Sequence, residues 1–424
     1  MTQTISEVLQ FIEENNIKFI RLAFCDIFGT MKNISIMPHE LERAFACGVA
    51  VDAAAVQGFR HMEESDLLLL PDAGTLSILP WRSMEGRVAR FYCNIQKPDG
   101  SFFCGDSRRI LQEAAARCAN LGYHCKIGPE CEFYLLRTDE NGDPTRIPMD
   151  NGGYCDISPL DRGENIRREI CLTLEDMGIL PENSHHEQGP GQNEIDFRCS
   201  GALNAADDLL TCKWAVRAIA ARNGLYATFL PKPFPGQAGS SMHANLSLYR
   251  EGENIFADFS ASPAAQSFLA GILRRAAEMT VFLNPLANSY RRFADDGAPR
   301  RIGWSAVSRQ LLVRLPGTQG DRRRMELRSP DPTCNPYLAF ALLLQAGLDG
   351  IEEGLALPAA DTELGVVPAT LQQAVQLARS SGFLARCLPE KLLTKYLEGK
   401  EEEWRYCQAA QDQALAVQEL YYYL

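Results

Sequence analysis

The sequence predicts an α+β protein with a small N-terminal domain and a larger C-terminal domain. Several short segments alternate apolar and polar residues with a period of two, which is typical of half-buried strands. Longer segments with helical periodicity lie between them. A turn at residues 97–100 (KPDG) divides the two regions. We therefore expect domains over residues 1–103 and 104–424.

The N-terminal domain is expected to begin with a helix and to contain a hairpin. The hairpin is predicted from two apolar segments that flank the Gly29–Thr30 turn. The predicted elements are a helix at 5–15, strands at 19–28 and 32–37, a helix at 40–47 that ends at Gly48, a loop at 51–59 and a strand at 87–95.

The C-terminal domain is expected to combine long helices with a polar-faced sheet. The first helix has Asp106 or Ser107 as its cap, and the fifth is entered through Asn335 and Pro336. The predicted helices are 106–121, 164–177, 205–223, 262–280, 334–353 and 391–424, and residues 137–153 are predicted to form a loop.

Four predicted strands carry charged or polar side chains on one face and apolar side chains on the other. Because side chains alternate along a strand, residues two apart point the same way. The polar faces hold Glu130 and Glu132 in strand 126–136, Glu194 and Asp196 in strand 193–198, His243, Asn245 and Ser247 in strand 242–248, and Arg324, Glu326 and Arg328 in strand 324–328.

Clustered glutamates with a histidine suit hard divalent cations such as Mg²⁺ or Mn²⁺. Neighbouring carboxylates repel each other and stay ionised together only with water or a cation between them. Glu187, on a Gly/Pro-rich segment before strand 193–198, adds another carboxylate. The alternative interpretation, a solvated strand face, would apply to any one of these strands alone. Together the strands predict a sheet that binds metal.

Arginines supply the positive charge that anionic substrates need. Residues 292–328 contain Arg292, Arg309, Arg314, Arg324 and Arg328, although the chain as a whole is acidic. Guanidinium groups match pairs of phosphate or carboxylate oxygens. The sequence has neither a Gly-x-x-x-x-Gly-Lys-Ser/Thr loop nor a Gly-x-Gly-x-x-Gly loop. Metal ligands beside arginines therefore predict phosphoryl transfer by positioning and charge neutralisation.

Composition excludes several other classes of function. The chain has 424 residues and a net charge of −12, which argues against binding to nucleic acid or to an anionic membrane. It has no apolar run long enough to span a membrane and no signal peptide. We therefore expect a cytoplasmic location and, for the 14 scattered cysteines, reduced thiols.

At these segments the sequence resembles the glutamine synthetase family. The resemblance covers nearly the whole chain, and the segments occur in the order found in the family. They are residues 63–67 (EESDL), 128–133 (GPECEF), 185–194 (HHEQGPGQNE), 232–233 (KP), 239–243 (GSSMH), 288–292 (NSYRR) and 324–340 (RMELRSPDPTCNPYLAF).

The resemblance implies a β-grasp domain followed by a catalytic domain, in which an antiparallel sheet flanked by helices lines the active site. It implies a ring of identical subunits, usually a dodecamer, with active sites shared between neighbours. The small-molecule substrates implied are glutamate, ATP and ammonia or an amine, with two or three Mg²⁺ or Mn²⁺ ions in each site.

The resemblance also implies roles for individual residues. One metal would be held by Glu132, Glu187 and Glu194, and a second by Glu130, His243 and Glu326. ATP would be bound by Ser247, Asn245, Arg309, Arg314 and Arg324, and glutamate by Gly239, Arg292 and Arg328. The residues implied in catalysis are Asp52, Arg309 and Arg328, and Asp52 would reach the amine from a neighbouring subunit.

The sequence departs from the family pattern at four places, mostly on the amino-acid or amine side. Asn245 replaces a second histidine, and Ala238 replaces an asparagine before Gly239. Gly297 stands where a flap carboxylate is expected, and Ala54–Ala55 replace two serines. All six implied metal ligands remain.

Three functions follow from this pattern: glutamine synthetase, a γ-glutamyl–amine ligase that accepts an organic amine or polyamine, and a non-catalytic scaffold. The retained ligands argue against the scaffold, because clustered like charges reduce the stability of a fold that does not use them. His61 and His186 are expected to have structural roles.

Overall fold

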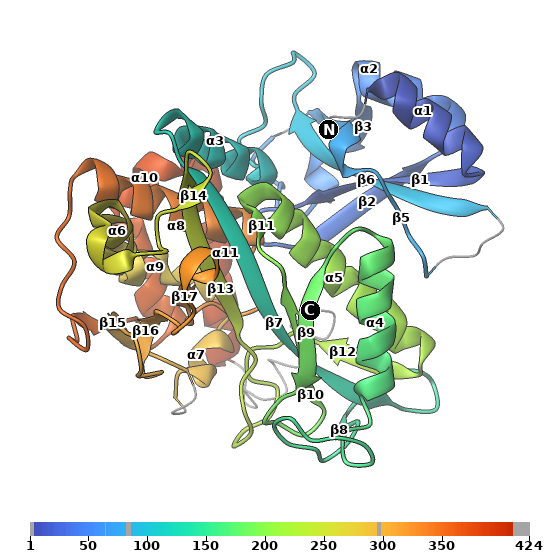
Figure 1. Cartoon of the computed structure of the whole chain (residues 1–424). Helices are drawn as coiled ribbons and strands as arrows, with labels where there is room; N and C mark the ends of the chain where they lie inside the picture. The colour runs from blue at the N-terminus through green and yellow to red at the C-terminus, as the bar shows by residue number, and fades with distance from the viewer. Residues whose placement is uncertain (1–3, 64, 82–85, 295–297, 410–424) are drawn as a thin grey trace.

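The computed structural model describes residues 4–63, 65–81, 86–294 and 298–409. It contains an N-terminal sheet with two short helices and a larger sheet accompanied by long helices (Figure 1). Within the described residues no helix is both long and apolar enough to cross a membrane. The same residues contain no disulfide bond.

The N-terminal unit has the β-grasp architecture. Helix α1 (Ile5–Glu14) starts with a capping box between Thr4 and Glu7, which satisfies the free N–H groups of the first turn. The sheet has the order β2-β1-β6-β4-β3, with β5 paired to β6, and β1 runs parallel to β6. Its elements are β1 (Ile17–Cys25), β2 (Met31–Ile36), α2 (Leu41–Cys47), β3 (Val49–Asp52), β4 (Asp66–Pro71), β5 (Ser77–Ile78) and β6 (Arg87–Gln96).

The larger sheet is organised around β7 (His124–Thr138), which pairs with five other strands. Its main path is β18-β15-β16-β17-β13-β7-β10-β9, and β8, β11 and β12 also pair with β7. The other strands are β8 (Pro144–Pro148), β9 (Pro181–His186), β10 (Gln192–Phe197), β11 (Ser200–Gly201), β12 (Leu225–Thr228), β13 (Met242–Arg250), β14 (Glu253–Asn254), β15 (Arg301–Ser305), β16 (Leu311–Arg314), β17 (Met325–Leu327) and β18 (Gly365–Val366).

Helices bury the apolar side of this sheet and extend the core. Helix α8 (Pro336–Glu352) is almost entirely buried and packs closely on α6 (Pro263–Leu283). A Cβ atom at Gly271 would lie 2.1 Å from the carbonyl oxygen of Ala346, so the two helices need glycine at this crossing. The remaining helices are α3 (Ser107–Asn120), α4 (Glu164–Asp176), α5 (Ala202–Arg222), α7 (Ser289–Arg292), α9 (Leu371–Arg379), α10 (Gly382–Cys387) and α11 (Glu390–Ala409).

Two predicted loops were partly wrong. Residues 137–153 include the end of β7 and strand β8. These strands pair at the edge of the sheet, where polar residues are tolerated, so the segment lacks the alternation of apolar and polar residues that marks a half-buried strand. Residues 51–59 begin inside β3, which pairs with β4. The predicted C-terminal helix is present as α11 up to Ala409, and residues 410–424 lie outside the described residues.

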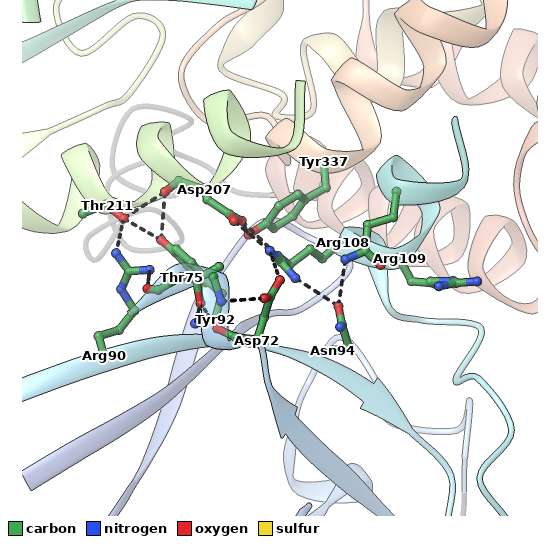
Figure 2. A network of polar contacts seen from close by, with 12 residues as sticks. Asp72, Thr75, Arg90, Tyr92, Asn94, Arg108, Arg109, Asp207, Thr211 and Tyr337 are labelled. Atoms are coloured by element: carbon green, nitrogen blue, oxygen red, sulfur yellow. Dashed lines mark hydrogen bonds and ion pairs between the residues drawn. The ribbon is translucent and has the colours of Figure 1, made fainter. Parts of the chain in front are cut away.

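A buried network of ion pairs and hydrogen bonds joins the N-terminal domain to the C-terminal domain (Figure 2). Arg108, at the start of α3, contacts both carboxylate oxygens of Asp207 on α5, with its Nε at 3.1 Å and its Nη2 at 2.9 Å. The same guanidinium donates to Asp72 and to Asn94 on the N-terminal side. Tyr337 of α8 donates to Asp207 at 2.6 Å. One arginine therefore links the β-grasp sheet to three helices of the second domain.

Replacing Arg108 should strongly destabilise the protein. In Arg108→Met the buried carboxylate of Asp207 loses its cation, which costs about 3–5 kcal/mol when one partner of a buried pair is removed. Arg109→Met is the matched control, because the neighbouring Arg109 is half-exposed and pairs with Glu113 on the surface. Denaturant unfolding should show a much lower midpoint for the first variant only, and equal midpoints would contradict this reading of the network.

Candidate active site

Strands β10, β7, β13 and β17 place their polar side chains together on one wall of a cavity of about 980 Å³. The pairing register sets this arrangement. Glu132 lies opposite Glu194, and Glu130 lies opposite both Asp196 and His243. Segments distant in the sequence therefore deliver carboxylates to neighbouring positions of one sheet.

The first group of possible ligands is Glu130, His243 and Glu326, whose ligand atoms lie within 4.8 Å of one another. His243 Nδ1 lies 2.9 Å from Glu130 and 3.8 Å from Glu326. Burial by itself would raise the pKa of Glu130, but the hydrogen bond and charge of His243 outweigh it and lower this pKa to about 2. The contact with His243 therefore favours the ionised form of Glu130.

Three further groups include Glu194: one with Glu132 and His243, one with His185 and Glu187, and one with Glu130 and Asp196. Glu132 accepts hydrogen bonds from the backbone N–H of Ser241 at 2.8 Å and from the side chain of Gln192 at 3.1 Å. The same Gln192 amide donates to the carbonyl oxygen of Gly239 at 3.1 Å. Gln192 therefore connects a possible metal ligand to the loop at Gly239.

Crowding by neighbouring carboxylates disfavours the ionised form of Glu194. Burial, followed by the charges of neighbouring carboxylates, raises the pKa of Glu194 well above its ordinary value. Burial raises the pKa of Glu132 to about 7. One carboxylate oxygen of Asp196 is buried without a hydrogen-bond partner. This donor set suits a divalent cation bound by oxygen and one or two imidazole nitrogens.

Arginines also line the cavity and contact its carboxylates directly. Arg314 and Arg328 contact Glu326 at 3.1 and 3.0 Å. Arg324 donates to the side-chain oxygen of Asn245 at 2.8 Å. Arg292 is buried and is fixed by the backbone oxygens of Ser329 and Arg328 and by Ser241. Cations and carboxylates thus lie side by side in one cavity, where guanidinium groups could bind a polyanionic substrate.

The structure brings most of the predicted site residues together. Those that line the cavity are Glu130, Glu132, Glu187, Glu194, Gly239, His243, Arg292, Arg309, Arg314, Arg324, Glu326 and Arg328. Asn245 and Ser247 are buried farther along β13 and are not among the lining residues, and Asn245 donates to Glu130 at 2.8 Å. Their roles toward ligands remain predictions.

The remaining predicted features differ in how they relate to this cavity. Asp52 is exposed at the end of β3, where its carboxylate accepts the N–H of Ala54, and it does not line the cavity. Gly297 lies outside the described residues. Ala238 does line the cavity, and its carbonyl oxygen accepts a hydrogen bond from Tyr134. In this chain alone, Asp52 is not part of the cavity.

Sequence reasoning missed His185 and Tyr154. His185 Nε2 lies 3.3 Å from Glu187 and 3.6 Å from Glu194, and the ring of Tyr154 packs edge-on against it. The pairing of His185 with Glu194 in β9–β10 could not be found in the sequence, because β9 has no apolar alternation. His186 is buried and bonded to Asp150, as expected for a structural histidine.

Comparison with known proteins agrees with this architecture. The model "Glutamine synthetase, beta-Grasp domain" matches residues 16–98, and "Glutamine synthetase, catalytic domain" matches residues 104–417. The chain belongs to the glutamine synthetase family. It is 43% identical over 421 residues to glutamine synthetase of Clostridium saccharobutylicum, covering 95% of each chain. It is 42% identical to glutamine synthetase of Methanosarcina mazei, covering 95% of this chain and 94% of that protein.

The fold also matches solved structures. A structure titled as a GmaS/ADP complex has a TM-score of 0.87 and 28% identity, with 99% of each chain covered. GmaS without ligand has a TM-score of 0.86 and 29% identity, with 97% of this chain and 98% of that chain covered. The glutamine synthetase architecture therefore extends over the whole described chain.

Binding of a divalent cation should release protons. Because the pKa of Glu132 is about 7, this group is mostly protonated at pH 6 and must ionise to bind metal. We expect Mn²⁺ affinity to rise from pH 6 to pH 8, with release of about one proton or more at pH 6. Calorimetry in buffers of different ionisation enthalpy measures both quantities, and a pH-independent affinity would contradict the expectation.

The raised pKa of Glu132 also makes the stability of the protein depend on pH. A folded-state pKa of Glu132 above its ordinary value of 4.5 means that the folded protein binds more protons than the unfolded one between about pH 4.5 and 7. The stabilisation from this group is complete below pH 4.5 and is lost as the pH rises through 7. Mg²⁺ should therefore raise Tm more at pH 8 than at pH 5. Glu132→Gln should reduce that difference.

Proposed function

We propose that this chain forms an amide at the γ-carboxylate of glutamate, with ATP as phosphoryl donor and ammonia as acceptor. One observation carries the proposal: five glutamates and a histidine from separate segments line a single cavity together with arginines. The family membership and the glutamine synthetases among its relatives support the same activity.

The cavity has two possible metal positions that would suit ATP and glutamate. Glu130, His243 and Glu326 would hold one Mg²⁺ or Mn²⁺ ion. Glu132, Glu187 and Glu194, which all line the cavity, would hold a second, as the family resemblance implies. His185 lies close enough to join the second set. Bound ions would neutralise the repulsion between the two anionic substrates.

The reaction would proceed in two steps. One γ-carboxylate oxygen of glutamate attacks the γ-phosphorus of ATP, the bond to the β,γ-bridging oxygen breaks, and ADP leaves. Ammonia then attacks the acyl carbon of γ-glutamyl phosphate, phosphate leaves, and the nitrogen loses a proton. Arg309 and Arg314 would bind phosphate oxygens, with Arg324 on the nucleotide side. Arg292 and Arg328 would hold the glutamate carboxylates.

The acceptor amine is less constrained by the cavity than the phosphoryl donor. The sequence has Gly297 where the family has a flap carboxylate, and Ala238 where the family has an amide that contacts glutamate. The lost flap carboxylate favours, as a second candidate, a γ-glutamyl–amine ligase that accepts an organic amine. The structural likeness to GmaS is consistent with either acceptor. A non-catalytic scaffold is the least supported reading, because crowded buried carboxylates reduce stability.

An acceptor panel tests the proposal. Phosphate release from ATP and glutamate should be measured with ammonia, methylamine, ethanolamine and a polyamine. Turnover with ammonia at millimolar concentration is the expected result, and a strong preference for one organic amine would establish the second candidate. ATP binding without turnover on any amine would rule out both ligases.

Removing the charge of Glu326 should abolish most activity. Glu326→Gln keeps the size of the side chain but removes a carboxylate that contacts His243, Arg314 and Arg328. We expect a fall in kcat/KM on the order of 100-fold or more, with weaker Mn²⁺ binding. Glu253→Gln is the control, because Glu253 is exposed on β14 outside the cavity. Equal activity of the two variants would show that Glu326 has no role in the active site.

Asp52 is proposed to reach the amine of a neighbouring subunit in a homo-oligomeric ring. Asp52→Ala and Glu326→Gln should each be inactive as pure oligomers. After denaturation and refolding together, mixed rings would contain some sites with both residues intact, so activity should return. Mixed oligomers that remain inactive, although mass spectrometry shows both subunits in one ring, would contradict the shared site.

A further inference from the structure

A second cavity of about 270 Å³ lies between the N-terminal sheet and helix α5, and it shares no lining residue with the candidate active site. Its walls come from β1, the β1–β2 turn, β2 and α5, together with Phe229 and Thr333. Figure 2 shows the neighbouring part of the same junction, where α5 packs against β6. The cavity therefore sits where the two domains meet.

Three of the thirteen residues around this cavity are cationic and none is acidic. Lys213 and Arg217 are four residues apart on α5, so they lie on the same face of the helix. Arg21 comes from β1 and stands over the ring of Trp214. Such a concentration of positive charge is notable in a chain whose net charge is −12.

The two cations on α5 have little compensation from the protein. Lys213 is buried and donates to the backbone oxygen of Pro332 at 2.7 Å. Among the described residues, Arg217 forms neither an ion pair nor a hydrogen bond, and its guanidinium stands 5.0 Å from the centre of the Phe229 ring. Burial lowers the pKa of both groups, as expected for cations without a carboxylate nearby.

An anion would offset this charge. Like charges four residues apart on a helix repel each other, and burying a cation without a counter-charge is unfavourable. A carboxylate or phosphate group between Lys213 and Arg217 would receive charge-assisted hydrogen bonds from both. The aromatic rings of Phe28, Trp214 and Phe229 would contact the apolar part of such a ligand. The volume suits a small metabolite and not a nucleotide.

We propose that this cavity is a second ligand site, distinct from the active site, which binds a small organic anion through Lys213 and Arg217. Its position between the domains makes it suited to an effector, because a ligand there would contact the β-grasp sheet and α5 together. The proposal does not depend on the metal, nucleotide or amine assignments of the active site.

Titration of the assembled full-length protein with inorganic phosphate and with succinate tests the proposal. Because the active site also attracts anions, the titrations should be repeated with Arg314→Gln, which alters only that site. We expect one binding event per chain that persists in Arg314→Gln and becomes roughly tenfold weaker or more in Arg217→Gln. Tighter binding of phosphate or of succinate would identify the anionic group preferred.

Arg222→Gln is the matched control, because Arg222 lies at the exposed end of the same helix and pairs with Glu169. It should bind both probes as the unmodified protein does. Wild-type crystals soaked in selenate give a measurement that does not depend on any variant folding, with an anomalous peak expected between Lys213 and Arg217. The absence of that peak, or unchanged binding in Arg217→Gln, would overturn the proposal.

Discussion

Electrostatic repulsion between carboxylates is the constraint on which the rest of this structure depends. Glu130, Glu132, Glu194 and Asp196 lie on two paired strands, where their charges disfavour one another. The sheet can hold them together because its opposite face is an extensive apolar core. Cys131, Phe133 and Ile195, which alternate with these carboxylates, are fully buried. The free energy of burying the hidden face thus offsets the repulsion on the functional face.

Much of this arrangement could be predicted from the sequence. The period of two identified β7, β10, β13 and β17 and the carboxylates on their common face, because each strand has one apolar side. Capping residues identified the starts of α3 and α8, where Asp106 and Asn335 accept backbone N–H groups. Strand alternation and helix capping depend on residues that are close together in the chain, so both can be predicted from a single sequence.

Features that depend on contacts across the fold could not be predicted in this way. The position of His185 beside Glu194 follows from the pairing of β9 with β10, and β9 (PENSHH) has no hydrophobic pattern to reveal it. In the sequence Lys213 and Arg217 look like ordinary helix residues. Only the packing of β1 and β2 beside α5 places them in a cavity. The role of Arg108 likewise requires Asp72 and Asp207, which are far from it in the sequence.

The two hydrogen bonds of the Gln192 amide have a consequence for how the cavity responds to its occupants. One N–H₂ group holds both the Glu132 carboxylate and the Gly239 carbonyl, and the Gln192 oxygen is itself fixed by the N–H of Gly189. Glu132 and the backbone at Gly239 are therefore joined through one side chain. A cation that moved Glu132 would also act on the loop at Gly239, so the affinities of the two sides of the cavity would be coupled through a single amide.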